Sequence, residues 1–240
     1  MNKIVVGNLK MSMATSEISD YLKQMQQLKY DHVIICPTNI YVPYFLKQKY
    51  KVGLQNIYEE ELGSFTGEVC PKQAATMGIK YTLIGHSDRR LLFHETDEII
   101  NKKIKAAKKY GMISILCIGE TWKEHKSHQT KRVLKNKLKK ELMNIGDLSK
   151  VIIAYEPSWS IGTNNILSNK EIIENVSFIK NYILKHFNYD MKVIYGGSIN
   201  IDNILMIRNI EEIDGILVGD SSTRASEFLD IIDAFFIRQN

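Results

Sequence analysis

The chain alternates short apolar runs with longer segments in which apolar residues recur every three or four positions. Eight of the short runs are rich in β-branched residues, and most are continuously apolar. Such runs are typical of strands buried on both faces of a parallel sheet. The expected strands are Lys3–Gly7, His32–Cys36, Val52–Gln55, Tyr81–Gly85, Ile113–Ile118, Val151–Tyr155, Lys192–Tyr195 and Gly215–Val218.

The longer segments predict amphipathic helices that separate these strands. A helix beginning at Thr96 is expected, and Ser168 with Glu171 three residues later forms a capping box for another. The expected buried faces include Ile18, Leu22, Met25 and Leu28 near the start of the chain and Phe228, Ile231, Ile232 and Phe235 near its end. The eight strand–helix cycles favour an α/β fold, a closed (β/α)8 barrel forming one domain over residues 1–240. A doubly wound open sheet is the alternative.

Polar residues gather where the expected strands end, and in a barrel these ends converge on one mouth. An acid, Glu156, directly follows Val151–Tyr155, and Pro157 holds it in extended geometry at the strand's carboxyl end. The small, polar segment Pro157–Asn165, with Gly162 at its centre, predicts a mobile loop. From this segment alone, a catalytic base beneath a lid and a helix-capping glutamate are equally good interpretations.

The other strand ends supply cationic, imidazole and glycine groups. They are Gly7-Asn8-Leu9-Lys10, Gln55-Asn56, Gly85-His86-Ser87-Asp88-Arg89-Arg90, Tyr195-Gly196-Gly197-Ser198 and Gly219-Asp220-Ser221-Ser222. A lone histidine is more often structural than catalytic, but His86 precedes an expected helix start, where the helix dipole favours a neutral ring. Glycine turns after the last two strands match the phosphate position of such barrels.

Composition and charge narrow the function classes. The net charge of +5 is concentrated in Lys123–Glu141, which holds eight basic and two acidic residues and is expected to form a basic helix. Its charges surround Val133, Leu134, Leu138 and Leu142, so a solvated helix face is favoured over a nucleic-acid or membrane surface. Cys36, Cys70 and Cys117 form neither a disulfide framework nor a metal motif, and buried thiols are expected. No targeting segment or membrane span is found, which predicts a cytoplasmic protein.

Taken together, these motifs resemble the triosephosphate isomerase family over essentially the whole chain. The resemblance rests on Gly7-Asn8-Leu9-Lys10-Met11, Gly63-Ser64-Phe65-Thr66-Gly67-Glu68, Ile84 to Arg90, Ala154-Tyr155-Glu156-Pro157 with Ile161-Gly162-Thr163, and Tyr195 to Ser198. It implies a TIM barrel that interconverts dihydroxyacetone phosphate and glyceraldehyde 3-phosphate without a cofactor or metal. It also implies a homodimer in which the loop Ser64–Glu68 brings Thr66 near the partner's Asn8 and His86.

The resemblance also implies residue roles. Glu156 would move the carbon-bound proton, neutral His86 would polarise the carbonyl, and Lys10 would stabilise negative charge. Asn8 would position the substrate oxygens. The phosphate would be bound by backbone N–H groups of Gly162, Ser198, Gly219 and Asp220 beneath the lid Pro157–Asn165.

Four departures from the family pattern are present: Leu9, Asp88, Asn164–Leu167 in the second lid hinge, and Asp220. The first three are expected to be tolerated. Asp88 is one methylene shorter than the usual glutamate, so any hydrogen bond between it and Lys10 would require a backbone shift or a water molecule. A carboxylate at Asp220 would repel each unit of phosphate charge by about 3 kcal/mol at a dielectric constant near 20. Its side chain could point to solvent, pair with Lys10 or Arg224, or cap a helix start, and the outward or capping conformation is favoured.

Two other functions are compatible with the residues. A sugar-phosphate epimerase would share the glycine turns, but it would need metal ligands at the strand ends, which offer one histidine and one glutamate. A non-catalytic barrel would lose the acid and base, and both are present.

Overall fold

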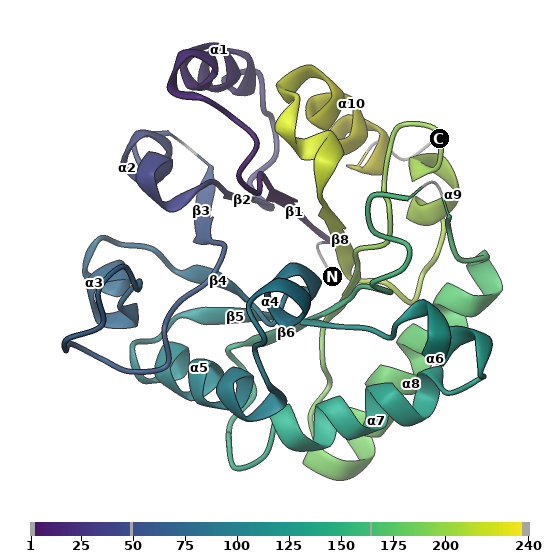
Figure 1. Cartoon of the computed structure of the whole chain (residues 1–240). Helices are drawn as coiled ribbons and strands as arrows, with labels where there is room; N and C mark the ends of the chain where they lie inside the picture. Colours follow the sequence, from purple (N-terminus) through teal and green to yellow (C-terminus); the bar gives the residue numbers. More distant parts are fainter. Residues whose placement is uncertain (1–2, 49, 164, 237–240) are drawn as a thin grey trace.

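Eight parallel strands close into a barrel in the computed structural model, which describes residues 3–48, 50–163 and 165–236. Each strand pairs with the next along the chain, and the eighth pairs with the first, so that Val5 lies opposite both Val33 and Ile216 (Figure 1). The strands are β1 (Ile4–Asn8), β2 (Val33–Cys36), β3 (Lys51–Leu54), β4 (Tyr81–Ile84), β5 (Ile113–Ile118), β6 (Val151–Tyr155), β7 (Val193–Tyr195) and β8 (Gly215–Val218). The predicted barrel is confirmed, and the open sheet is excluded.

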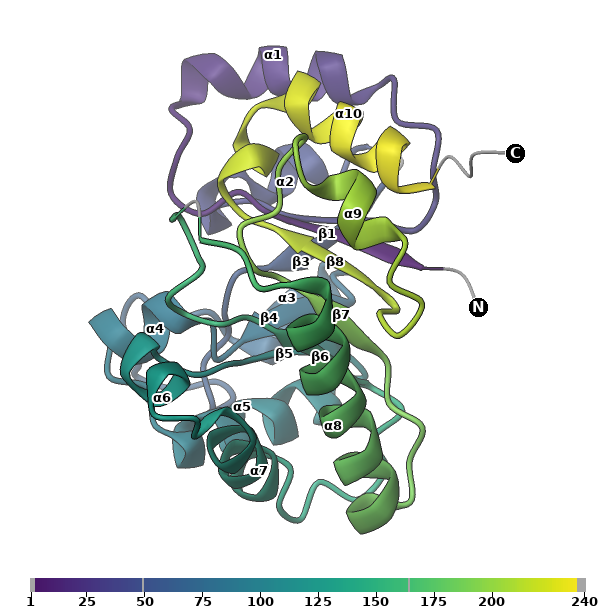
Figure 2. The ribbon, with the colours of Figure 1, turned by 90° about the vertical axis from the view of Figure 1, so that its right-hand side faces the viewer.

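Helices surround the barrel. They are α1 (Thr15–Met25), α2 (Val42–Phe45), α3 (Pro71–Thr76), α4 (Ser87–Leu92), α5 (Asp97–Lys109), α6 (Trp122–Lys126), α7 (Thr130–Glu141), α8 (Asn169–Phe187), α9 (Ile204–Arg208) and α10 (Ala225–Phe236), with 3-10 turns at Asn39–Tyr41 and Asp220–Thr223. Figure 2 shows the barrel from the side, with α1 and α10 along one edge and α7 and α8 along the opposite edge. Within the described ranges, no helix is long and apolar enough to cross a membrane.

The helix starts follow the sequence signals. Thr96 caps α5 by accepting a hydrogen bond from the backbone of Ile99, and Ser168 and Glu171 form the predicted capping box of α8. One expectation is wrong: the basic segment Lys123–Glu141 contains two helices instead of one. The chain turns between α6 and α7, where His128 adopts a φ of 55° and the Ser127 hydroxyl donates to the carbonyl of Lys123. The helix predicted to reach Leu28 also ends earlier, at Met25.

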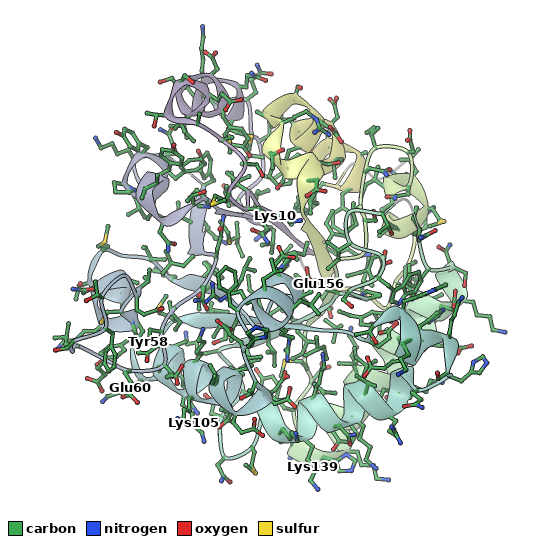
Figure 3. The ribbon with its side chains drawn as sticks, viewed as in Figure 1. Lys10, Tyr58, Glu60, Lys105, Lys139 and Glu156 are labelled. Carbon is green, nitrogen blue, oxygen red and sulfur yellow. The ribbon has the colours of Figure 1, made fainter. Side chains whose placement is uncertain are left out.

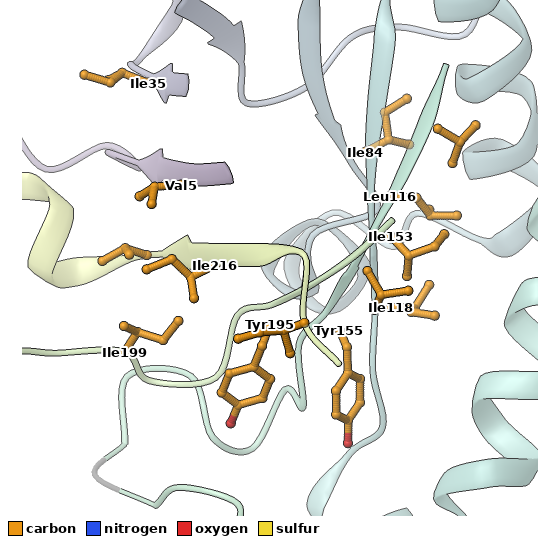
Figure 4. Packing of buried hydrophobic residues seen from close by; sticks show 14 of the residues in the cluster. Val5, Ile35, Ile84, Leu116, Ile118, Ile153, Tyr155, Tyr195, Ile199 and Ile216 are labelled. Carbon is orange, nitrogen blue, oxygen red and sulfur yellow. The ribbon is translucent and has the colours of Figure 1, made fainter. Parts of the chain in front are cut away.

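The strands are buried on both faces, as their continuous apolar pattern predicts. Alternate residues fill the barrel interior, including Val6, Ile152 and Ala154. The residues between them pack outward against the helices, as Val5, Ile153, Tyr155 and Tyr195 do in Figure 4. Full burial of one such aliphatic side chain stabilises the fold by about 1.5–3 kcal/mol.

Two further expectations about buried residues are confirmed. Leu134, Leu138 and Leu142 form the buried side of the α7 region, while Val133 is half-buried. The lysines of α7 face solvent except Lys137, which is half-buried. The three cysteines are buried and free of disulfides.

Candidate active site

The predicted site residues meet at the carboxyl ends of the strands. Figure 3 shows Lys10 and Glu156 near the barrel axis, whereas Tyr58 and Glu60 lie at the periphery. One cavity of about 150 Å³ is lined by all of the residues assigned from the sequence: Asn8, Lys10, His86, Glu156, Gly162, Ser198, Gly219 and Asp220. It is also lined by residues not assigned to the site from the sequence, namely Ile161, Gly196, Ile199, Asn200, Leu217 and Ser221.

Glu156 lies one residue beyond β6, with its side chain buried below the cavity. Its backbone N–H donates to Ile118 O at 2.7 Å, which extends the pairing of β6 with β5 by one residue. A methyl group added at Gly196 would lie 2.7 Å from Glu156 Cγ, so the glycine turn after β7 leaves the room that the glutamate occupies. The position of Glu156 therefore depends on two neighbouring strands as well as its own.

The environment of Glu156 favours its protonated form more than water does. Burial raises the pKa of Glu156 above its ordinary value, against the opposing influence of His86, Cys117 and Lys10. Its Oε2 atom is buried and accepts no hydrogen bond from the part of the chain that the structure describes. A carboxylate with an unpaired buried oxygen is a stronger proton acceptor than one saturated by donors.

His86 immediately precedes α4 and caps it with its own ring. The backbone N–H of Asp88 donates to His86 Nδ1 at 3.2 Å, so a neutral ring carries its proton on Nε2. That Nε2 lies 3.7 Å from Glu156 Oε1. The carboxylate of Asp88 lies 3.5 Å from Nδ1, on the side of the ring away from Glu156. Asp88 thus faces the histidine.

Lys10 is held in a left-handed backbone conformation with a φ of 48°. The side-chain oxygen of Asn8 accepts from the Lys10 N–H at 3.1 Å, and Thr38 and Gln55 donate to the Lys10 carbonyl, each at 2.8 Å. Ser198, on the far side of the cavity, has a φ of 42°. Such conformations cost about 1 kcal/mol or more for residues other than glycine and cluster at functional sites.

The Lys10 ammonium pairs with Asp220, at 2.9 Å between Nζ and Oδ1. The favoured expectation for Asp220, an outward or capping side chain, is therefore wrong. The 3-10 turn that begins at Asp220 is closed by the backbone and hydroxyl of Ser222, which both donate to Gly219 O, so a carboxylate cap is not needed. Asp220 turns instead to the nearest cation, while its side chain stays 62% exposed.

Internal hydrogen bonds hold the lid together, including those from the Thr163 hydroxyl to the carbonyls of Trp159 and Ser160. Glu120 anchors the start of the lid. The backbone of Ser158 donates to Glu120 O at 3.0 Å, and the Trp159 indole donates to Glu120 Oε1 at 3.1 Å. The Tyr155 hydroxyl also donates to this buried carboxylate, at 3.2 Å to Oε2. Glycine and serine content had predicted the loop, but not its anchor. Asn164, one of the predicted lid residues, lies outside the described residues.

The described acidic and imidazole groups of the site are not arranged as a set of metal ligands. Among residues 3–48, 50–163 and 165–236, no group of three or more histidine, cysteine, aspartate or glutamate residues is arranged to hold a metal ion. The arrangement that remains is a buried carboxylate facing an imidazole, with an ammonium at the rim. Such a set can move protons between adjacent carbon and oxygen atoms of a small anionic substrate.

Comparison with known proteins agrees with this geometry. The sequence model of the family described as triosephosphate isomerase matches residues 3–235. The triosephosphate isomerase of Clostridium botulinum (strain Loch Maree / Type A3) is 35% identical over 243 residues, covering 96% of this chain and 98% of the relative. The triosephosphate isomerases of Mycoplasma mobile and Dictyoglomus turgidum are 34% and 35% identical, with the same coverage of both chains. The chain therefore belongs to the triosephosphate isomerase family.

Proposed function

We propose that this chain interconverts dihydroxyacetone phosphate and glyceraldehyde 3-phosphate with Glu156 as the base that carries the proton between C1 and C2. The 3.7 Å separation of Glu156 Oε1 and His86 Nε2 beneath a phosphate-sized cavity carries the proposal. Family membership supports this isomerase over the epimerase and over a non-catalytic barrel. The reaction is a step of glycolysis, which also supports the expected cytoplasmic location.

The proton path follows from the groups in reach. Glu156 removes a proton from the carbon next to the carbonyl, and the electron pair moves onto the carbonyl oxygen to give an enediolate. The Nε2–H of His86 donates to that oxygen, because Nδ1 is occupied by the N–H of Asp88. Lys10 stabilises the negative charge. His86 passes its Nε2 proton to that oxygen and takes one from the neighbouring hydroxyl, which becomes the new carbonyl. Return of the proton from Glu156 to the former carbonyl carbon completes the exchange, so no redox cofactor is consumed.

We assign phosphate binding to backbone groups in the loops after β6, β7 and β8. Gly162, Ser198, Gly219 and Asp220 of these loops line the cavity. Backbone N–H groups in glycine turns bind phosphate, and Lys10 adds a positive charge beside Gly219 and Asp220. The lid Pro157–Asn165 keeps water away from the enediolate, which otherwise eliminates phosphate.

The test is isomerase turnover in a coupled assay on chelator-treated protein, with Glu156→Gln as the decisive variant. Glutamine keeps the size of the side chain and removes the base, so turnover should fall by about 10² to 10⁴ while the fold is retained. Circular dichroism checks the fold. Activity of the variant within about threefold of wild type would show that another group is the base.

We also propose that the active form is a homodimer through the loop Ser64–Glu68. Segments following β1, β3 and β4 expose large apolar side chains, among them Met11, Leu62, Phe65, Leu92 and Phe93. Such side chains, gathered at one end of a barrel, are typical of an interface. Sedimentation at low micromolar concentration should give two chains per particle, and a fully active monomer would contradict the proposal.

A further inference from the structure

Arg90 of α4 links the ends of two neighbouring strands. Its Nε donates to Gly85 O at 2.6 Å, and its Nη2 donates to Cys117 O at 2.7 Å. Gly85 follows β4, and Cys117 is the next-to-last residue of β5. The guanidinium is thus a fixed fork that sets the spacing of these two strand ends.

These two carbonyls belong to the chain segments that carry the proposed acid and base. Gly85 directly precedes His86, and the Cys117 side chain faces the Glu156 carboxylate closely enough to lower its pKa. Gly85 has a φ of +72°, and a methyl group there would lie 2.7 Å from Arg90 Nη2. A cavity of about 80 Å³ behind the site is lined by Arg90 and Glu156 together. A shift of the guanidinium would therefore move both segments.

The charge that holds Arg90 in place comes from another helix. Glu141, the last residue of α7, is completely buried, and Arg90 Nη1 donates to its Oε1 at 2.8 Å. One turn earlier on α7, Lys137 Nζ donates to Gly119 O at 2.8 Å. Gly119 lies against the backbone of Glu156, since a methyl group on it would overlap the Glu156 carbonyl. The carboxyl end of α7 is thus linked to three backbone carbonyls around the site. Arg90, paired with Glu141, reaches those of Gly85 and Cys117, and Lys137 reaches that of Gly119.

The charged groups packed around Glu141 shift the pKa of its carboxyl group. They are Arg90 from α4, Asp97 from α5, and Lys137 from its own helix, while Lys140 pairs with Asp97 at 3.3 Å. Burial raises the pKa of Glu141 to about 7, against the opposing influence of Arg90 and Lys137. Its Oε2 atom accepts no hydrogen bond from the described residues. This carboxyl therefore changes its charge near neutral pH.

We propose that Glu141 is a positioning residue whose negative charge holds Arg90 on the carbonyls of Gly85 and Cys117 and so fixes the distance between His86 and Glu156. The inference rests on the proposed roles of those two residues. When Glu141 is neutral, Asp97 at 3.3 Å is the remaining carboxylate beside Arg90. The guanidinium then turns toward Asp97 and its hold on the strand ends weakens.

The test compares kcat of wild type and Glu141→Gln between pH 5.5 and 8.5. At pH 8 the variant should be slower by about tenfold, the scale of a displacement of a few tenths of an ångström in a reacting pair. At pH 6 about nine-tenths of wild-type Glu141 is neutral, and the ratio of the two kcat values should shrink to about two. Titration of Glu156 and of the substrate affects both proteins and cancels in this ratio.

Two further variants make the test specific. Glu174→Gln, which removes an exposed carboxylate paired with Lys131 on the protein surface, should match wild type at every pH. Asp97→Asn should show the opposite pattern to Glu141→Gln. Its kcat should be close to that of wild type at pH 8, where Glu141 holds Arg90, and should lie above it at pH 6, because the carboxylate that raises the pKa of Glu141 and draws Arg90 away is gone. This variant also serves if Glu141→Gln does not fold.

The outcomes separate this inference from the proposed function. A kcat ratio that is constant with pH would show a merely structural role for Glu141 and overturn the inference. A kcat ratio of one at every pH would also overturn the inference. In either case, an active wild type and an inactive Glu156→Gln variant would still support the proposed function. An inactive wild-type protein would instead refute the proposed function.

Discussion

Replacement of Asp220 by asparagine should tighten substrate binding. Asp220 supplies a negative charge at the edge of the cavity where the phosphate is proposed to bind, and it also engages Lys10 at 2.9 Å. Asparagine keeps the backbone N–H and the approximate size of the side chain. The variant therefore isolates the charge.

The size of the change in substrate affinity depends on how far the Asp220 side chain is exposed to solvent. The Asp220 side chain is 62% exposed, so a dielectric constant near that of water applies and the sequence-based figure at 20 is too high. At roughly 5 Å, each unit of phosphate charge is then repelled by about 0.8 kcal/mol, or about 1.6 kcal/mol for a dianion. Lys10 cancels part of this repulsion, and salt screens it further. A net gain of about 1 kcal/mol remains, which is about fivefold in affinity.

The measurement is KM for glyceraldehyde 3-phosphate at low and at physiological salt. Asp220→Asn should lower KM by about three- to fivefold at low salt and by less as salt is added, with kcat little changed. Asp20→Asn, which removes an equal charge from the exposed face of α1, is the matched control and should leave KM unchanged.

Asp220→Gly separates charge from backbone freedom. Asp220 is not among the described residues with a positive φ, so glycine should give no benefit beyond that of asparagine. Improvement by glycine alone would refute the charge argument. An unchanged KM in both variants at low salt would mean that Lys10 already neutralises the carboxylate.

Two further predictions concern other charges. Burial raises the pKa of Glu156, so this base becomes protonated at a higher pH than an ordinary carboxylate does. As the pH falls, kcat/KM should therefore decrease at that higher pH. An acid limb at or below pH 4.5, after correction for the substrate phosphate, would contradict this. Lys103→Met should lower the free energy of unfolding by about 3 kcal/mol in urea titrations, because buried Glu95 would keep Arg89 as its single cationic partner. A loss below about 1 kcal/mol would show that Arg89 alone compensates the charge.

The barrel and its mouth could be predicted from the sequence because both depend on local patterns. A strand buried on two faces leaves a continuous apolar run, and the residue after it must lie at the strand's end. Glu156 illustrates this: β6 ends at Tyr155, as expected, and Pro157 follows. Capping boxes likewise need residues only three positions apart, which is why α8 begins where Ser168 predicts.

The errors arise where the local sequence gives no signal for the outcome. The break between α6 and α7 has no glycine or proline to mark it. Asp220 pairs with Lys10 instead of capping the turn that it begins. Ion pairing with a residue 210 positions away leaves no trace in local sequence. Strand ends could be identified, but the partners of their side chains could not.

The buried network around Glu141 extends this distinction from structure to function. In the sequence, Glu141 belongs to a basic segment and looks like one of its few surface acids, because it directly follows two lysines at the end of α7. In the fold it lies on the buried side with Leu134 and Leu138, and its charge reaches Arg90, 51 residues earlier. A buried charge is retained at a cost in desolvation, so its partners must hold it in one geometry. Where that geometry includes the backbone beside an acid and a base, a residue outside the cavity can govern the rate.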